Sequence, residues 1–195
     1  MCEFHTIPLK IYNLLEYMKQ SRLTSEFFKN EVLKVAPDLL GKYLVRKFTN
    51  GKTERYIISE VEAYRGDGDL ACHASKGKTS RTEVMFRTGG LVYVYLVYGI
   101  HWLLNIVTGK EGDASAVLIR GLIDIPGPGR VGKILQLDKS FYGEDLSTSD
   151  RIWIEESDIK ISYDTAPRIG IDYAGEPWKS KQWRFFITQS TTPDL

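Results

Sequence analysis

Two glutamates two positions apart, Glu60 and Glu62, are the side chains in this sequence best placed for acid–base chemistry. If residues 57–64 form a regular strand, alternation puts both carboxylates on one face together with Ile58 and Tyr64. Neighbours two apart on a strand lie roughly 6.5 to 7 Å apart, so mutual repulsion can raise one pKa, as a general acid or base requires. A solvated face, on which both glutamates pair with Lys or Arg of a neighbouring strand, also explains the spacing and is favoured on spacing alone. The pattern therefore does not identify a catalytic base.

Aromatic side chains gather in one short segment. Aromatic residues make up 12% of the chain, and four of them lie within ten positions, shortly after a basic loop at residues 76–81. Stacking surfaces beside phosphate-binding groups recur in nucleic-acid proteins, where each base stacked on a ring contributes about 1 to 3 kcal/mol. Packing in strands and at core edges also explains most of these rings. The four are Tyr93, Tyr95, Tyr98 and Trp102.

Histidine and cysteine are too sparse for a metal centre. The chain has three histidines and two cysteines, and the cysteines lack the CxxC spacing of zinc or thiol redox sites. His73 remains a candidate acid, base or pocket residue. Asn105 lies in an otherwise apolar strand, where a buried amide needs hydrogen-bond partners, so it is either structural or a ligand contact. We expect no metal centre.

Composition limits the class of protein. With 195 residues and 43% hydrophobic content, the chain suits one globular domain. The net charge of +1 gives no polybasic arm, so any nucleic-acid surface must be a local patch. The N-terminal segment does not read as a signal peptide, and no run approaches the roughly 18 apolar residues of a membrane helix. We expect an intracellular protein without a membrane partner.

The periodicity indicates a mixed α/β (α+β) fold with mainly local, antiparallel strand connections. An apolar stripe predicts a helix at 9–20, and Pro37 is typical of the first turn of a second helix that ends at Gly41. A long loop is expected at 66–82. The tip between two apolar strands, residues 98–101, is unusually apolar for a connection that faces water. Further elements are a hairpin at 43–64 that turns at Asn50-Gly51, two strands flanking that tip, a strand at 115–122, a short helix after 127–129, and strands near 151–154 and 183–188.

Several segments together resemble the alkyladenine (3-methyladenine) DNA glycosylase family. They run in order from about residue 23 to 188 and cover nearly the whole chain. The E-A-Y, Y-V-Y-x-x-Y-G and N-I elements are jointly specific, although each alone is weak. The matching segments are FF at 27–28, LLGKYLVR, EVEAYRGDGDLACHAS, MFRTGGLVYVYLVYGIHWLLNIV, VLIRGL, GPGRVGKILQLDKSFYGEDL, PRIGIDYAG and WRFFI.

The resemblance implies a base pocket. Glu62 matches the carboxylate that activates the attacking water, whereas Tyr64, His73 and Tyr95 match rings that enclose the extruded base. Stacking on these rings offsets the few kcal/mol lost when a base leaves the helix, most favourably for an electron-poor alkylated purine. Asn105 matches a pocket residue that excludes normal guanine.

Other matches imply contacts with DNA. Tyr98, with Ile100 and His101 beside it, matches the hairpin tip that enters the minor groove and fills the vacated space, which accounts for its apolar character. Thr79 and Arg81 match the loop that contacts the DNA backbone, and their hydroxyl and guanidinium groups suit phosphate oxygens. Arg120 matches a position near the site.

The implied protein is a single compact domain over 23–195, preceded by a helical extension at 1–22. It has a curved, mainly antiparallel sheet, surrounding helices and a protruding β-hairpin that enters the DNA minor groove. The implied activity is that of a monofunctional DNA glycosylase, a cofactor-free monomer that hydrolyses the N-glycosidic bond of damaged purines in double-stranded DNA. The damaged purines include 3-methyladenine, 7-methylguanine and, by extension, hypoxanthine and ethenoadenine.

Two alternatives from other classes remain open. One is a non-catalytic nucleic-acid-binding domain of the formyltransferase C-terminal type, which has no reason to hold a carboxylate inside an aromatic pocket. The other is an ordinary sugar hydrolase that uses Glu60 and Glu62, which does not explain the basic loop or the exposed tip.

Overall fold

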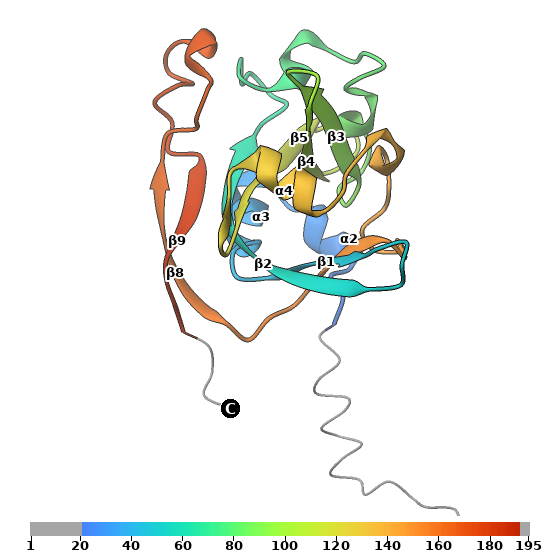
Figure 1. The fold of residues 1–195 in the computed structure, drawn as a ribbon. Helices are drawn as coiled ribbons and strands as arrows, with labels where there is room; N and C mark the ends of the chain where they lie inside the picture. Colours follow the sequence, from blue (N-terminus) through green and yellow to red (C-terminus); the bar gives the residue numbers. More distant parts are fainter. Residues whose placement is uncertain (1–20, 192–195) are drawn as a thin grey trace, which may run out of the picture.

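The computed structural model describes residues 21–191, which form one mixed α+β domain around a curved antiparallel sheet (Figure 1). The strand order is β3-β4-β5-β2-β1-β7, with β6 paired to β5, β9 to β2 and β8 to β9. This confirms the expected fold class. The strands are β1 (Tyr43–Lys47), β2 (Thr53–Tyr64), β3 (Val92–Val97), β4 (His101–Thr108), β5 (Ser115–Leu122), β6 (Ile125–Pro126), β7 (Ile152–Glu155), β8 (Lys160–Ala166) and β9 (Arg184–Thr191).

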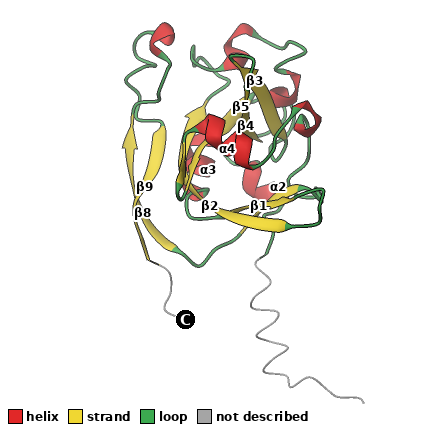
Figure 2. Ribbon diagram, viewed as in Figure 1, coloured by secondary structure: helices red, strands yellow, loops and turns green. Residues whose placement is uncertain are grey.

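Short helices lie in the connections between the strands, and α3 and α4 pack against the sheet (Figure 2). Helix α3 contacts β2 and β5, and helix α4 contacts β4 and β5, so both helices contribute to one main hydrophobic core. No helix within residues 21–191 is both long and apolar enough to span a membrane. The helices are α2 (Ser25–Phe28), α3 (Val32–Asp38) and α4 (Pro128–Ile134), with 3-10 turns η1 (His73–Lys76), η2 (Glu83–Phe86), η3 (Lys139–Phe141) and η4 (Asp172–Ala174).

Helix α3 corrects the expected helix start at Pro37. The helix runs from Val32 to Asp38, and Pro37 lies near its end instead of in its first turn. The buried positions recur at i, i+3, i+4 and i+7, which is the apolar stripe that binds this helix to the core. These positions are Val32, Val35, Ala36 and Leu39. The helix predicted at 9–20 lies outside the described residues.

The hairpin expected at 43–64 is confirmed as β1 and β2, which pair antiparallel across the turn at Asn50-Gly51. Irregular pairing between β2 and β5 changes the predicted faces of β2, because Ser59 and Arg120 are left out of the register. Ile58 therefore lies in the main core with Val61 and Ala63. The prediction that Ile58 shares a face with Glu60 and Glu62 is wrong.

The apolar segment after residue 91 forms the expected pair of strands, β3 and β4, joined by a tight turn. Tyr98 and Gly99 both have positive φ angles, 53° and 72°, and the Ile100 N–H donates to the Val97 carbonyl. Positive φ at both central positions is the geometry of a type I′ turn, which suits the twist of an antiparallel hairpin.

Strand β8 has no counterpart among the predicted elements. Most of its side chains are exposed, and its sequence KISYDTA lacks the apolar alternation by which the other strands were recognised. It is held by pairing with β9, which in turn joins the sheet through β2. The chain leaving β8 rises beside the sheet and carries residues 167–175 toward the site described next (Figure 1).

Candidate functional site

The site lies on the face of the sheet opposite the main core. Neighbouring residues on β3, β4, β5 and β2 form one row across four strands, because their registers are aligned. Alternation places each second residue of these strands on the same face. The row consists of Tyr93, Asn105, Leu118 and Glu62.

A cavity of about 460 Å³ opens over this row. Loops at 71–73 and 169–173 form its sides, and the turn between β3 and β4 forms part of its rim. Eight of the eleven residues to which the resemblance assigned a role line it, although they come from β2, the loop at 66–82, β3 with its tip, β4 and β5. These are Glu62, Tyr64, His73, Arg81, Tyr95, Tyr98, Asn105 and Arg120.

Glu62 has no solvent-accessible surface, yet its carboxylate is directly hydrogen-bonded. The backbone N–H of Ile169 donates to Oε1 over 2.8 Å, and the Tyr64 hydroxyl donates to Oε2 over 2.8 Å. Arg120 Nη1 lies 3.4 Å from Oε1. The carboxylate is therefore fixed in orientation while it faces the cavity.

Burial raises the pKa of Glu62, since a desolvated carboxylate is less stable in its charged form. Arg120, the Ile169 N–H and the Tyr64 hydroxyl act in the opposite direction by stabilising the charge, and repulsion from Glu60 adds a smaller upward contribution. A carboxylate with a raised pKa is a stronger base than an ordinary glutamate, which suits it to take a proton from water.

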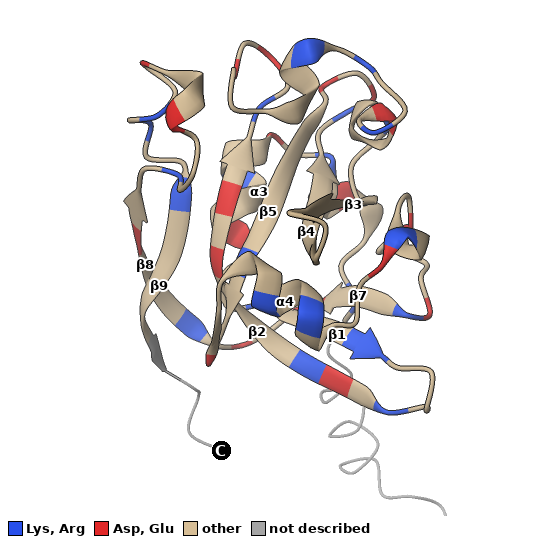
Figure 3. Ribbon diagram, turned by 45° about the horizontal axis from the view of Figure 1, so that its top comes forward, with Lys and Arg blue, Asp and Glu red and all other residues tan. Residues whose placement is uncertain are grey.

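The structure separates the two glutamates that the sequence left equivalent. Glu60 Oε1 accepts from Arg120 Nε at 3.1 Å and from Arg184 Nη1 at 3.0 Å, and Glu60 does not line the cavity. The prediction that these glutamates pair with Lys or Arg of a neighbouring strand is thus correct for Glu60. Figure 3 shows acidic positions on the part of β2 that runs beside β5. Within residues 21–191, Glu62 is the only acidic side chain that lines the cavity.

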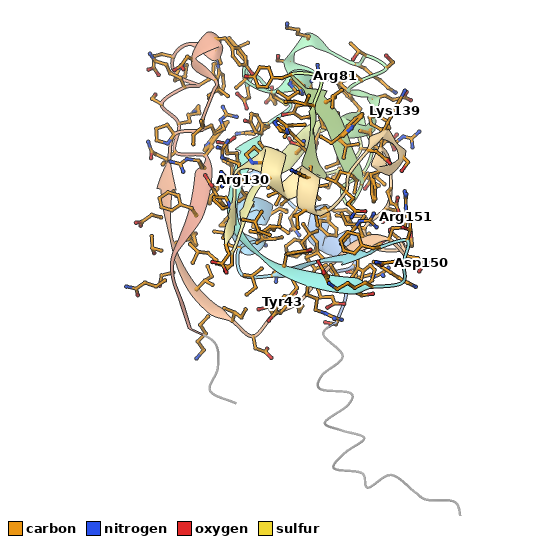
Figure 4. All side chains as sticks on the ribbon, viewed as in Figure 1. Tyr43, Arg81, Arg130, Lys139, Asp150 and Arg151 are labelled. Atoms are coloured by element: carbon orange, nitrogen blue, oxygen red, sulfur yellow. The ribbon has the colours of Figure 1, made fainter. Side chains whose placement is uncertain are left out.

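Aromatic rings form one wall of the cavity. His73 and Tyr95 meet edge to face with ring centroids 4.6 Å apart, and Tyr93 lies behind them, 5.4 Å from Tyr95. The Arg81 guanidinium lies over the Tyr95 ring at 5.0 Å, a cation–π contact. Arg81 lies above β3 in the view of Figure 4. Since His73 and Tyr95 touch each other, a planar ligand has to lie against this pair and not between its members.

The His73 and Tyr93 rings of this wall and the neighbouring Cys72 thiol are uncharged at neutral pH. Burial, followed by the nearby charges of Arg81 and Lys76, lowers the pKa of His73 to about 4. Its Nδ1 lies 2.9 Å from the Tyr93 hydroxyl, and burial raises the pKa of Tyr93 to about 12. Burial also raises the pKa of Cys72, which lines the cavity, to about 12, so its thiol is not a ready nucleophile.

Tyr64 forms a second ring surface. The Arg168 guanidinium covers one face of its ring at 4.7 Å, so a ligand in the cavity can stack only on the other face. Asn105 is buried, and its amide Nδ2 donates to the Tyr93 carbonyl over 3.2 Å. This bond fixes the amide while it lines the cavity.

The tip of the β3–β4 hairpin is exposed beside the cavity. The relative exposures of Tyr98 and Ile100 are 90% and 71%, values unusual for large apolar groups. Ile100 and His101 do not line the main cavity but a smaller hollow between the tip and α4. Thr79 also lies outside the cavity, and its hydroxyl is hydrogen-bonded to Thr82, which closes the turn before η2.

The sequence analysis missed two contributors from the segment at 167–175. Ile169 supplies a backbone donor to Glu62, and Tyr173, which is 70% exposed, lies at the cavity rim with its hydroxyl donating to the Ala71 carbonyl. A backbone N–H has no signature in sequence, although the quoted segment PRIGIDYAG contains both residues. Within residues 21–191, no group of three or more His, Cys, Asp or Glu side chains is arranged to hold a metal ion.

Comparison with known proteins gives consistent matches. The family described as Methylpurine-DNA glycosylase (MPG) matches residues 26–126 and 124–191. A protein of Psychrobacter cryohalolentis is 38% identical over 93% of this chain and 98% of its own length. One of Legionella pneumophila is 43% identical over 85% and 94%, and one of Wolbachia pipientis wMel is 45% identical over 86% and 92%. All three carry the name "Putative 3-methyladenine DNA glycosylase".

Proposed function

The chain belongs to the methylpurine-DNA glycosylase family, whose members hydrolyse N-glycosyl bonds in DNA, and we propose that it removes alkylated and deaminated purines with a water molecule activated by Glu62. The observation that carries the proposal is the Glu62 carboxylate, which is fully buried and yet oriented into an aromatic cavity by two hydrogen bonds and an ion pair with Arg120. A binding module gains nothing from a desolvated carboxylate at this position.

The cavity accepts a base that has rotated out of the duplex. Its rings offer two stacking surfaces, the His73–Tyr95 pair on one side and the open face of Tyr64 on the other. Stacking between them offsets the free energy of leaving the helix, and a cationic purine gains most because the rings are electron-rich. A neutral His73 supports this, since a second positive charge would repel a cationic base.

Hydrolysis proceeds through an oxocarbenium-like sugar. As the bond between C1′ and the base nitrogen breaks, its electron pair leaves with the base, and the water oxygen bonds to C1′. Glu62 accepts the proton that the water loses, which contributes about 10² to 10⁴-fold to the rate. Arg120, close to Glu62, balances the negative charge of the carboxylate before the reaction.

Lesions differ in how much help they need. 3-Methyladenine and 7-methylguanine carry a positive charge and leave as neutral bases, so extrusion and a positioned water suffice. Hypoxanthine and ethenoadenine are neutral and need a proton on the departing base. Asn105 serves selectivity, because its fixed amide beside the cavity opposes the exocyclic amino group of guanine; 7-methylguanine has the same group but leaves readily because of its positive charge.

The hairpin tip holds the duplex open. Tyr98 enters the minor groove and fills the space of the extruded base, and Ile100 and His101 pack against the neighbouring base steps. Arg81 and Thr79 contact backbone phosphates, Arg81 from the rim of the cavity and Thr79 from the exposed loop next to it. We assign residues 23–195 to the catalytic domain, which acts as a monomer on double-stranded DNA, and residues 1–22 to an extension.

Base release from defined duplexes tests this function. Duplexes with a single 7-methylguanine or a single hypoxanthine are incubated with the full chain, and free base is quantified by chromatography. Release of the modified base, with no protein–DNA adduct after borohydride treatment, is the expected result. Tight lesion-specific binding without release from either duplex would instead identify a binding domain, and a borohydride-trapped adduct would refute direct attack by water.

A further inference from the structure

A buried ion pair lies directly behind the site. Arg168 Nη1 donates to Asp69 Oδ2 over 2.6 Å and Nη2 to Oδ1 over 2.9 Å, and neither side chain has any solvent-accessible surface. Two parallel charge-assisted hydrogen bonds fix both the distance and the plane of the partners. Neither residue lines the cavity.

The pair joins three segments that form the site. Arg168 Nη1 also donates to the Ala63 carbonyl, so it is tied to β2 between Glu62 and Tyr64. Asp69 accepts from the Ala71 N–H over 3.0 Å and thereby orders the start of the loop that carries His73. The residue after Arg168 is Ile169, whose N–H donates to Glu62.

The Arg168 guanidinium is also packed between two rings. Its Cζ lies 4.7 Å from the centroid of Tyr64 and 5.0 Å from that of Trp183. Tyr64 is the ring whose hydroxyl donates to Glu62. The two groups that donate hydrogen bonds to the Glu62 carboxylate, the Tyr64 hydroxyl and the Ile169 N–H, are therefore held by contacts with Arg168 or by the chain next to it.

Stability alone does not account for this arrangement. Burying two charges costs several kcal/mol per ion, and a well-packed apolar pair is often as stable as a buried ion pair. The Arg168 Nε is buried without a hydrogen-bond partner within residues 21–191, a further cost. What the pair provides is a fixed geometry among segments that are far apart in the sequence.

We propose that Arg168 and Asp69 are positioning residues for Glu62: their bidentate contact holds the Ile169 N–H and the Tyr64 hydroxyl on the carboxylate. The inference rests on the proposed function, because it concerns the group that activates water. Neither residue touches the base or the water. They act through the two donors, and their loss leaves the carboxylate free to rotate away from the reacting atoms.

Loss of the contact has a signature that destabilisation alone lacks. The Ile169 and Tyr64 donors lower the pKa of Glu62 against the upward effect of burial. When they move away, the ionised carboxylate loses its hydrogen bonds, and the pH below which base release declines moves upward. Because the stacking rings remain in the cavity while the carboxylate loses its donors, the rate of the chemical step falls by a larger factor than KM rises.

Arg168→Lys is the first variant, because it keeps the charge and removes the two-point contact with Asp69. Single-turnover release from a 7-methylguanine duplex is measured across pH, together with KM and the thermal midpoint. We expect the rate constant to fall about tenfold to 10²-fold, as for small misplacements of a catalytic group, and the acid limb to move to higher pH. Asp69→Asn, which keeps the side-chain volume, should show the same pattern and serves if Arg168→Lys does not fold.

Glu155→Gln is the matched control. It weakens an ion pair in which the half-exposed Arg55 donates from Nε to the buried Glu155 over 2.7 Å, on the edge strand β7 at the end of the sheet opposite β3. This variant should lower the thermal midpoint without moving the acid limb. Equal rate losses and unshifted acid limbs in Arg168→Lys, Asp69→Asn and Glu155→Gln would overturn the proposal.

A readout that does not need activity keeps the two proposals distinguishable. Carboxyl NMR titration of Glu62, assigned with Glu62→Gln, reports its pKa in each folded variant. A higher pKa in Arg168→Lys than in the wild type supports the positioning role even if the wild type releases no base, a result that would refute only the proposed function. An unchanged pKa in both Arg168→Lys and Asp69→Asn would overturn the positioning role.

Discussion

Removing the ring of Tyr98 separates DNA binding from folding more cleanly than any other change at the site. The side chain is 90% exposed, so Tyr98→Ala removes almost no buried surface, and the stability change should remain within about 0.5 kcal/mol. The backbone there has φ 53°, a region that alanine tolerates about as well as tyrosine does. Any large effect of the variant must then come from the bound state.

The size of that effect follows from stacking. A ring placed between base steps replaces one stacking partner on each side of the vacated position, and such contacts are worth about 1 to 3 kcal/mol per base. Counting only one such stack, the dissociation constant for a lesion duplex should rise roughly 5- to 150-fold. Tyr98→Phe keeps the ring and should bind within about threefold of the wild type, since the hydroxyl adds no apolar contact.

Fluorescence anisotropy with a labelled 7-methylguanine duplex gives the dissociation constants, and thermal melting gives the stabilities. A single-stranded oligonucleotide with the same lesion is the second substrate, because it has no vacated space to fill. Tyr98→Ala should bind it as the wild type does. Full affinity of Tyr98→Ala for the duplex, or an equal loss on both substrates, would refute the wedge role.

Three further predictions concern stability. Because burial raises the pKa of Glu62, the folded state holds this proton more tightly than the unfolded chain, and stability is lost as the pH rises through the folded pKa. Glu62→Gln should therefore raise the thermal midpoint at about pH 8, with a difference that shrinks toward about pH 4; a lower midpoint at the higher pH would contradict this. The pKa of His73 is lowered to about 4, so the wild type should lose stability as the pH falls from about 6.5 to 4. In His73→Gln, the thermal midpoint should fall less over this pH range. Parallel pH dependences in the two proteins would show that His73 does not titrate in this way. Gly132→Ala should destabilise the domain by about 1 to 3 kcal/mol in urea unfolding, because an added Cβ would lie 1.8 Å from the Trp102 carbonyl oxygen; an unchanged midpoint would mean that α4 can shift on β4.

Local patterns were sufficient for much of the sheet. Asn50-Gly51 marks the turn between β1 and β2, and the structure has this hairpin, with Gly51 at a positive φ of 84°. The two apolar stretches around the tip at 98–101 likewise mark β3 and β4. Strand β8 carries no such pattern, since it is held at the edge mainly by backbone pairing and buries few side chains.

The site was only partly accessible from the sequence. Strand alternation places Glu60 and Glu62 on one face, but spacing cannot tell that Arg120 and Arg184 bind the first while the second is buried. That distinction depends on the irregular register between β2 and β5, which no local pattern predicts. The Ile169 donor is 107 positions from Glu62, and every residue other than proline has such an N–H.

The most direct test of the account compares the two neighbouring glutamates in one reaction. Single-turnover release of 7-methylguanine from duplex DNA is measured for the wild type, Glu62→Gln and Glu60→Gln, each with its thermal midpoint. Glu62→Gln should lower the rate constant by about 10² to 10⁴-fold while retaining lesion binding, because the carboxylate that takes the proton from water is gone. Glu60→Gln should retain a rate constant within about tenfold of the wild type, since it removes only a partner of Arg120 and Arg184. A rate constant for Glu62→Gln equal to that of the wild type would contradict the account.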